Sequence, residues 1–361
     1  MSMKKLVSAL FALTLLMLSC DSDETTSTTT STYDASALLS SWTYNHIIPD
    51  YTEFVTYTQA LIEAKDTFVN DATEANLVLL RQAYIDAYTN FQHIGAYGVG
   101  LADTSNYYLY INTFPTDAEE IESNITAGFT SSDLDSVFQQ PTQGFPAIDY
   151  LLNGIASSDA EIITALTDSH LDYLSIVVDK IDSRTDTILA DWNTSYASTF
   201  VANSGSDITS SPNKFYNALV FYFENYVRRQ KIDIPAGVFT SDTFSGSIES
   251  VYDAEESKDL LIAAFDKFED FYLGSDEDTT SLSSVLVSVG RSDLDTAIKA
   301  QFGVAATAID ALDANLGSQI DTDNLLMLTA RDEIQKIVAY LKVDVASALD
   351  FSITFVDNDG D

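Results

Sequence analysis

The chain has 361 residues, with 17 Lys and Arg against 55 Asp and Glu, three His and one Cys, and a formal charge of −38. Apolar residues make up 46% and aromatic residues 11%, enough for a packed core, so the chain is not a disordered acidic polymer. Such a charge is repelled by phosphate backbones and excludes nucleic acid as a partner. A single cysteine excludes a disulfide framework and any multi-cysteine metal site.

The first 19 residues are typical of a secretory signal peptide. Lys4 and Lys5 precede a largely apolar stretch, residues 6–18, that is too short to span a bilayer comfortably. The stretch ends in Met-Leu-Ser-Cys, which resembles a bacterial lipobox, so we expect cleavage after residue 19 and lipidation of Cys20. A plain secretory signal that happens to end in cysteine is the alternative.

Residues 20–36 form the predicted lipidated N-terminus and a flexible Ser/Thr tether. Acidic residues 21–24 follow the cysteine closely and resemble the surface-export signal of Bacteroidetes lipoproteins. A solvated spacer is the other interpretation. We therefore expect a cell-envelope protein that is lipid-anchored to the outer membrane, on its surface or its periplasmic face.

Helical spacing of apolar residues recurs along the rest of the chain, and no segment resembles a ladder of strands. Capping boxes at Thr116 and Ser158, and proline after Ser211, mark helix starts. The chain is therefore predicted to be all-α. The expected helices cover residues 36–70, 75–97, 117–126, 146–153, 159–192, 212–230, 249–273, 292–316 and 322–349.

A polar stretch rich in Ser, Thr, Asn and Gly divides these helices into two sets, each of about four long segments. This favours two up-and-down lobes that resemble four-helix bundles. The predicted boundaries are 37–195 for the N-terminal lobe, 196–211 for the linker and 212–356 for the C-terminal lobe. Residues 357–361 resemble the opening of a calcium loop without its closing Glu, so an acidic tail is expected.

Sequence chemistry alone does not predict an enzyme. The usual signatures of zinc hydrolases, di-iron bundles, P-loops and serine hydrolases are missing from the sequence. The acidic run at 117–122 could ligate a metal, although complementing a helix N-terminus explains it more simply. Four cations cluster within residues 214–231 and either face a helix C-terminus or form a positive pocket for a carboxylate or phosphate. They are Lys214, Arg228, Arg229 and Lys231.

Four stretches together resemble imelysin-like proteins, the peptidase M75 superfamily, and in particular its Bacteroidetes lipoproteins. Asn-Thr-Phe-Pro at residues 112–115 resembles the family's N-x-[WYF]-P segment, and residues 143–152 resemble the block that carries its G-x-H-x-x-E motif. Residues 231–237 and the C-terminal end, from 341 onward, are also similar to that subgroup. The resemblance extends over residues 38–361.

The resemblance implies an all-helical protein of two bundle-like halves with a site at their junction. It also implies an envelope protein linked to iron or haem acquisition; one relative is a reported insulin-cleaving protease and another binds alginate. This chain departs from the motif, because Gly144, Pro146 and Asp149 stand where the family has Gly, His and Glu. Proline cannot ligate a metal or act as a base, so a peptidase mechanism that depends on the motif is disfavoured.

We therefore predict an imelysin-like lipoprotein that binds a ligand, in iron or haem acquisition, with no catalytic residue and no zinc site. In the expected junction, Asn112 and Asp149 supply hydrogen bonds, Phe145 supplies apolar contact, and Arg228 or Lys231 meets an anionic group of the ligand. Asp149 is the one candidate metal ligand. The complete predicted site is Asn112, Pro115, Gly144, Phe145, Pro146, Asp149, Tyr150, Arg228, Lys231, Pro235 and Gly237.

Two other functions stay open. One is an M75-type metallopeptidase that replaces the lost motif histidine with His93 or His170. The other is a lipoprotein that interacts with envelope proteins or binds glycans. The partners expected from the first prediction are the membrane, through Cys20, a small anionic ligand, haem or iron, and envelope proteins.

Overall fold

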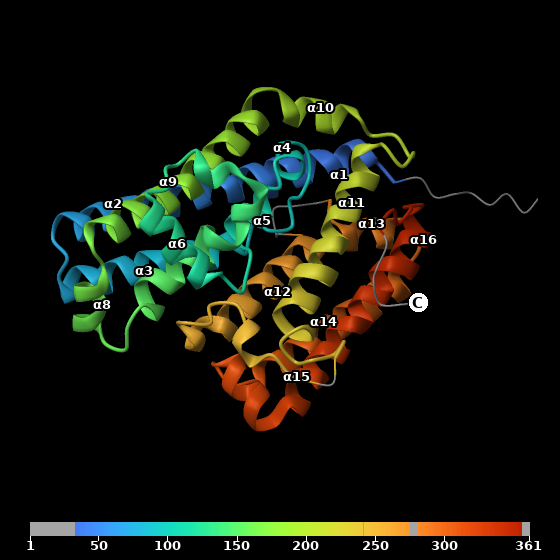
Figure 1. Cartoon of the computed structure of the whole chain (residues 1–361). Helices are drawn as coiled ribbons and strands as arrows, with labels where there is room; N and C mark the ends of the chain where they lie inside the picture. Colours follow the sequence, from blue (N-terminus) through green and yellow to red (C-terminus); the bar gives the residue numbers. More distant parts are fainter. Residues whose placement is uncertain (1–32, 241, 275–279, 356–361) are drawn as a thin grey trace, which may run out of the picture. The chain divides into compact units, whose positions relative to one another are not determined.

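The computed structural model describes residues 33–240, 242–274 and 280–355, and within these ranges all regular secondary structure is helical (Figure 1). The all-α prediction is confirmed. The predicted signal peptide, Cys20, most of the tether and the acidic tail lie outside the described residues.

The α-helices are α1 Ala35–Ser41, α2 Ile48–Asn70, α3 Glu74–Phe91, α4 Leu101–Thr104, α5 Tyr107–Ile111, α6 Ala118–Ala127, α7 Gly144–Asp149, α8 Asp159–Ala165, α9 Asp168–Asp191, α10 Ala197–Ala202, α11 Ser211–Phe221, α12 Ser257–Leu273, α13 Leu282–Ser288, α14 Ser292–Asp310, α15 Leu316–Ala339 and α16 Ala346–Leu349. The π-helical segments are η1 Trp42–Ile47, η4 Tyr150–Gly154, η5 Trp192–Tyr196, η6 Tyr222–Asp233 and η9 Tyr340–Val345. The 3₁₀ turns are η2 Asp133–Asp135, η3 Val137–Thr142, η7 Ser245–Ser247 and η8 Ala254–Glu256.

The helices before residue 203 form an N-terminal group that is built around α2. This helix packs between α3 and α9, and α7 also packs on α9 (Figure 1). Buried positions recur every three or four residues along α2, as in Tyr51, Phe54, Leu61 and Phe68. One face of α2 is therefore the centre of this core, as expected for a helix with an apolar stripe.

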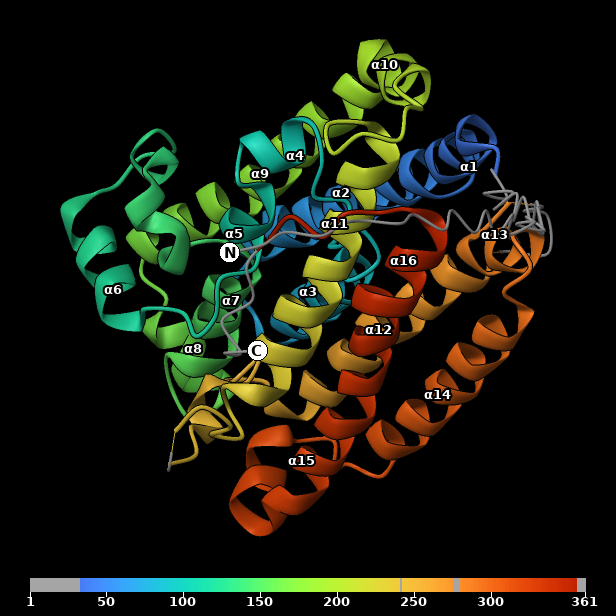
Figure 2. The ribbon, with the colours of Figure 1, turned by 90° about the vertical axis from the view of Figure 1, so that its right-hand side faces the viewer.

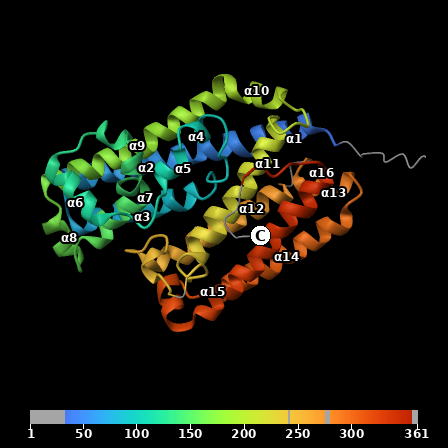
Figure 3. The ribbon, with the colours of Figure 1, turned by 45° about the vertical axis from the view of Figure 1, so that its right-hand side comes forward.

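The helices from residue 211 onward form a C-terminal group. Here α15 packs against α14 and η6, and η6 also packs against α12 (Figures 2 and 3). Phenylalanines fill the interior: Phe223 of η6 stacks on Phe268 of α12 with ring centroids 4.2 Å apart, and Phe302 of α14 lies beside both. The two groups meet where α12 contacts α3 and α1 contacts α11, and the described residues belong to one compact unit.

Several predicted helices differ from the structure in their bounds: the helix predicted at 75–97 ends at Phe91, the one at 292–316 ends at Asp310, and the one at 322–349 begins at Leu316. The predicted helix 159–192 is interrupted, because Leu166 and Thr167 leave helical geometry and α9 restarts at Asp168. The Thr167 hydroxyl lies 2.7 Å from Nδ1 of His170, a side-chain contact of the kind that favours helix starts. The predicted helix 249–273 begins only at Ser257, because the segment before it inserts into the contact between the two groups.

The connection between the groups also differs in its bounds. Helix continues through α10 to Ala202, and residues 203–210 join it to α11. The division into two domains with a linker at 196–211 stays a prediction.

Candidate functional site

A buried asparagine at the end of α5 links the motif region to the C-terminal group. Asn112 is 0% exposed, and its side chain makes three hydrogen bonds. Its Oδ1 accepts from the hydroxyl of Tyr88, 2.6 Å away, and its Nδ2 donates to Oε1 of Glu249 at 2.6 Å and to the Tyr108 hydroxyl at 3.3 Å. The asparagine predicted from sequence therefore joins α3 and α5 to a segment of the C-terminal group.

Lys231 of η6 lies on the other side of the same carboxylate. Its ammonium is bonded to Glu249 and donates to Oε1 of Gln92 at 3.1 Å, while the Gln92 amide donates to Glu249 at 3.2 Å. Each of these side chains is 2% exposed or less. We call Gln92, Asn112, Lys231 and Glu249 the junction network, because Gln92 and Asn112 belong to the N-terminal group and the other two to the C-terminal group.

Burial lowers the pKa of Lys231 well below its ordinary value. An ammonium in the interior is tolerated when a carboxylate and further hydrogen bonds accompany it, and Glu249 and Gln92 supply both. The anion that Lys231 meets in this structure is therefore part of the same chain. Whether a ligand ever contacts Lys231 stays a prediction.

Asp149 forms a second link between the groups at the end of α7. Its carboxylate accepts from the backbone N–H of Tyr252 at 2.9 Å and from the amide of Asn153 at 3.0 Å, and it is 1% exposed. Burial raises the pKa of Asp149 to about 7, and the hydrogen bonds to its carboxylate oppose that rise. The backbone around Tyr252 reaches this position through Ser250, which has a positive φ of 56°.

Gly144 and Phe145 fix the start of α7 against α5 and α3. Gly144 has a φ of +74°, and a Cβ there would lie 2.2 Å from the carbonyl oxygen of Ile111, so only glycine fits. The Phe145 ring stacks on Tyr88 with centroids 4.6 Å apart. Pro146 is buried beside them in the first turn of α7, where the helix needs no backbone donor.

The other predicted residues lie further from the junction network. Arg228 pairs with Asp233 at 3.0 Å, inside the C-terminal group, and Asp233 also accepts from Arg331 of α15 at 3.4 Å. Pro235 accepts a bond from Phe244 through its carbonyl, as part of the loop after η6. The same loop contains Gly237, while Pro115 is exposed and the Tyr150 hydroxyl donates to Glu122 at 2.8 Å.

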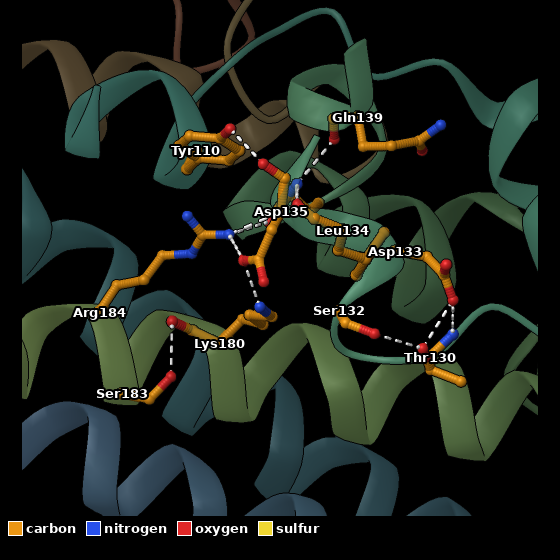
Figure 4. Close-up of polar contacts among 11 residues, drawn as sticks. Tyr110, Thr130, Ser132, Asp133, Leu134, Asp135, Gln139, Lys180, Ser183 and Arg184 are labelled. Carbon is orange, nitrogen blue, oxygen red and sulfur yellow. Dashed lines mark hydrogen bonds and ion pairs between the residues drawn. The ribbon is translucent and has the colours of Figure 1, made fainter. Parts of the chain in front are cut away.

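A loop of residues 128–143 positions the residue just before α7, and it is held by two of the few cations in the N-terminal group (Figure 4). Asp135 accepts from Lys180 at 2.5 Å and from Arg184 at 3.1 Å, both on α9. The Arg184 guanidinium also donates to Gln143 at 3.3 Å, and the Gln143 amide donates to Leu134 O at 2.7 Å. These contacts fix the entry into Gly144 and hence the position of Asp149.

Sequence reasoning missed Gln92 and Glu249. Gln92 follows the last turn of α3, and Glu249 was expected inside a helix, so neither had a motif that marked it. A weak signal exists in each case, since a glutamine beside an apolar stripe and an acid that directly follows an isoleucine in a serine-rich stretch are unusual enough to inspect. Their function is visible only once residues far apart in sequence are brought together.

Two hollows lie beside the junction network, between residues 95–109 and the α11–η6 helix. The smaller one, of about 120 Å³, is lined by aromatic side chains and is called the aromatic pocket; its lining includes Tyr108, Phe221, Tyr222 and Tyr226. The larger one, of about 600 Å³, shares Gly98, Asp103, Ala218 and Phe221 with it and includes Lys214; we call it the junction groove. Lys214 is an exposed member of the predicted cation cluster.

The side chains of the described residues do not form a group that could coordinate a metal ion. Within residues 33–240, 242–274 and 280–355, no three His, Cys, Asp or Glu side chains are grouped to hold an ion. His170 instead lies 3.2 Å from Glu122, and His93 contacts Asn90 at 3.4 Å. Asp149 is engaged by Tyr252 and Asn153.

The imelysin (peptidase M75) family model matches residues 47–343 of this chain. The chain belongs to the imelysin family. A search of curated protein sequences finds no match. The family match includes Gly144, Pro146 and Asp149, and their correspondence to the G-x-H-x-x-E motif stays a prediction.

Two solved structures share the imelysin fold of this chain. An imelysin-like protein from Psychrobacter arcticum 273-4 has 16% identity and a TM-score of 0.75, covering 90% of this chain and 98% of that one. A protein from Parabacteroides distasonis ATCC 8503, described as an iron-regulated protein A precursor, has 20% identity and a TM-score of 0.73, with coverages of 87% and 95%. At these identities the likeness establishes the fold.

Among the described residues of this imelysin, no helix combines the length and apolar character that crossing a membrane requires.

Proposed function

We propose that this imelysin is a lipid-anchored binding protein of the cell envelope, and that its ligand is haem or another iron-bearing compound. The anchor would be Cys20, the first residue after the predicted signal peptide. The observation that carries the proposal is the pair of hollows at the contact between the two helical groups, next to a buried polar network that holds the groups together. Binding sites commonly occupy such contacts.

Iron is favoured by relatives, since the Parabacteroides protein is named as iron-regulated. Because the described residues gather no metal-binding set, the iron would arrive with its own ligands, as it does in haem. The exposed Lys214 on the junction groove, which Asp103 also lines, could then meet a carboxylate of the ligand.

The deciding experiment is metal and haem analysis of the protein purified from its native membrane, followed by haem titration of the purified chain. We expect bound haem or iron, and about tenfold weaker haem binding for Lys214→Glu. A matched control is Lys299→Glu, a surface lysine on α14 that pairs with Asp295 of the same helix. A protein without haem or iron, with no thermal shift on adding either, would instead be a structural or interaction lipoprotein.

The peptidase alternative has a separate test. Incubation of the purified chain with protein substrates, with and without chelator, should show no cleavage, because Pro146 offers no imidazole. Chelator-sensitive cleavage that Asp149→Ala abolishes would replace the binding proposal with an enzyme.

A further inference from the structure

We propose that the aromatic pocket binds a small organic cation, such as an alkylammonium group, a function that goes beyond the capture of iron or haem. The pocket measures about 120 Å³, and Asp103 is the charged residue among those that line it. The junction groove is also lined by Asp103 but includes Lys214, whereas the lining of the aromatic pocket includes no cation.

The walls of the pocket are aromatic rings that contact one another. Tyr108 stacks on Tyr226 with centroids 3.8 Å apart, Tyr222 lies 6.0 Å from Tyr108 in an edge-to-face arrangement, and Phe221 lies 5.5 Å from Tyr226. Such a group of electron-rich rings attracts cations, and quaternary ammonium groups are the ligands that aromatic cages characteristically hold.

The tyrosines are held in place from behind by the junction network. The Tyr108 hydroxyl accepts from Nδ2 of Asn112 at 3.3 Å, and the Tyr222 hydroxyl donates to the carbonyl of Gln92 at 3.3 Å. These bonds fix the rings before a ligand arrives, so the pocket is pre-organised and little ordering cost is left for binding. The hydroxyls are committed to the interior at these two positions.

Asp103 places a negative charge beside the rings. Burial raises the pKa of Tyr226 to about 12, and the nearby Asp103 carboxylate contributes to that rise. Asp103 is exposed, so its charge is available to a ligand that enters from solvent. A cation between Asp103 and the rings would be attracted by the carboxylate and by the ring faces. An anion would be repelled by Asp103 and by the formal charge of −38.

The pocket has room for side chains that would close it. A Cβ added at Gly98 would lie 4.0 Å from the Cβ of Ala218, which is ordinary contact distance, so a larger residue there can grow into the pocket without a backbone clash. Gly98→Val is therefore a variant that fills the site, and Asp103→Asn is one that removes only its charge.

The test is calorimetric titration of the purified full chain with choline and with its uncharged isostere 3,3-dimethylbutan-1-ol, at physiological ionic strength. We expect choline to bind at least about tenfold more tightly than the isostere. Asp103→Asn should weaken choline binding about tenfold, and Gly98→Val should abolish it. The control is Asp172→Asn, which alters an exposed aspartate that lines a hollow elsewhere, on α9.

Three results would overturn the inference: no binding of choline, equal binding of choline and its isostere, or equal weakening by Asp103→Asn and Asp172→Asn. The last result would indicate attraction by net charge alone. Far-UV circular dichroism and the melting temperature of each variant confirm that the fold is retained. Haem binding is measured separately, so choline binding without haem would leave this inference standing while the iron proposal failed.

Discussion

The Lys231 ammonium and the Glu249 carboxylate are bonded to each other in the interior, where each side chain is 2% exposed or less. Lys231 lies in the last turn of the long π-helical segment η6, and Glu249 comes from a non-helical stretch that reaches into the N-terminal group. Asn112 and Gln92 of the N-terminal group also hydrogen-bond to this pair. The ion pair therefore contributes to the contact between the two helical groups.

Glu249→Gln should lower the free energy of unfolding by about 3–5 kcal/mol, because it leaves the Lys231 ammonium buried without a carboxylate to balance its charge. The double change Lys231→Met with Glu249→Met should lower the free energy of unfolding by less than Glu249→Gln does, since neither charge of the pair remains. Urea unfolding followed by circular dichroism measures both. The control Asp293→Asn removes a surface partner of Arg291 and should change the free energy of unfolding little. If Glu249→Gln lowered the free energy of unfolding as little as this control does, the importance of the buried pair would be refuted.

Asp149 should make stability depend on pH in a definite direction. Its pKa in the folded protein is raised from 3.8 to about 7, so between these values the folded state holds more protons than the unfolded state. The stability contributed by the protonated carboxyl is therefore complete below about pH 4 and is lost as the pH rises through about 7, by roughly 4 kcal/mol in all.

Asp149→Asn should remove this dependence. The measurement is the urea midpoint of wild type and variant from pH 4.5 to 7.5, and the variant should gain stability relative to wild type as the pH rises. Glu256, whose pKa burial also raises, is present in both proteins, so its contribution cancels in the difference. Parallel pH profiles for the two proteins would mean that Asp149 titrates normally.

Asp135→Asn should loosen the loop of residues 128–143 with little effect on overall stability. Asp135 is well exposed, so losing its bonds to Lys180 and Arg184 should cost less than about 1 kcal/mol. Hydrogen exchange in the loop should nevertheless rise, because these bonds attach it to α9. Asp133→Asn, whose side chain bonds only locally to Thr130 among the contacts drawn, is the matched control (Figure 4).

Gly95 and Gly98 should differ sharply in their tolerance of alanine. A Cβ at Gly95 would lie 2.6 Å from the ring of Tyr222, so Gly95→Ala should cost about 1–3 kcal/mol. At Gly98 the nearest atom is 4.0 Å away, and alanine should leave stability unchanged or raise it by up to about 1 kcal/mol. Thermal melting compares the two, and equal melting temperatures would show that Tyr222 moves aside freely.

Cys20→Ser should abolish lipid attachment and release the protein from the membrane fraction. The measurement is labelling of cells with a radioactive fatty acid, followed by fractionation and mass determination of the mature N-terminus. A variant that still labels, or that stays in the membrane fraction, would contradict an anchor at Cys20.

Helices were predictable from sequence because their apolar stripes repeat locally, as in the run of buried residues along α2. Asn112, Asp149 and Lys231 could also be selected, from the family resemblance and from an uneven distribution of cations. Their partners could not, because Asn112 and Glu249 are 137 residues apart and no local pattern pairs them. The start of α12 was misplaced for the same reason, since the pairing of Glu249 and the bond from Tyr252 to Asp149 override local helical preference.

The location of Glu249 also bears on the order in which the protein can fold during synthesis. Asn112 and Gln92 are synthesised early, yet Glu249, the acceptor that they share, emerges from the ribosome well over a hundred residues later. Until then the N-terminal helices would bury two amides without their final partners, which is costly in an apolar interior. Early-made helices should therefore stay loosely assembled, and chains that terminate before residue 249 should be preferred substrates for proteases and chaperones.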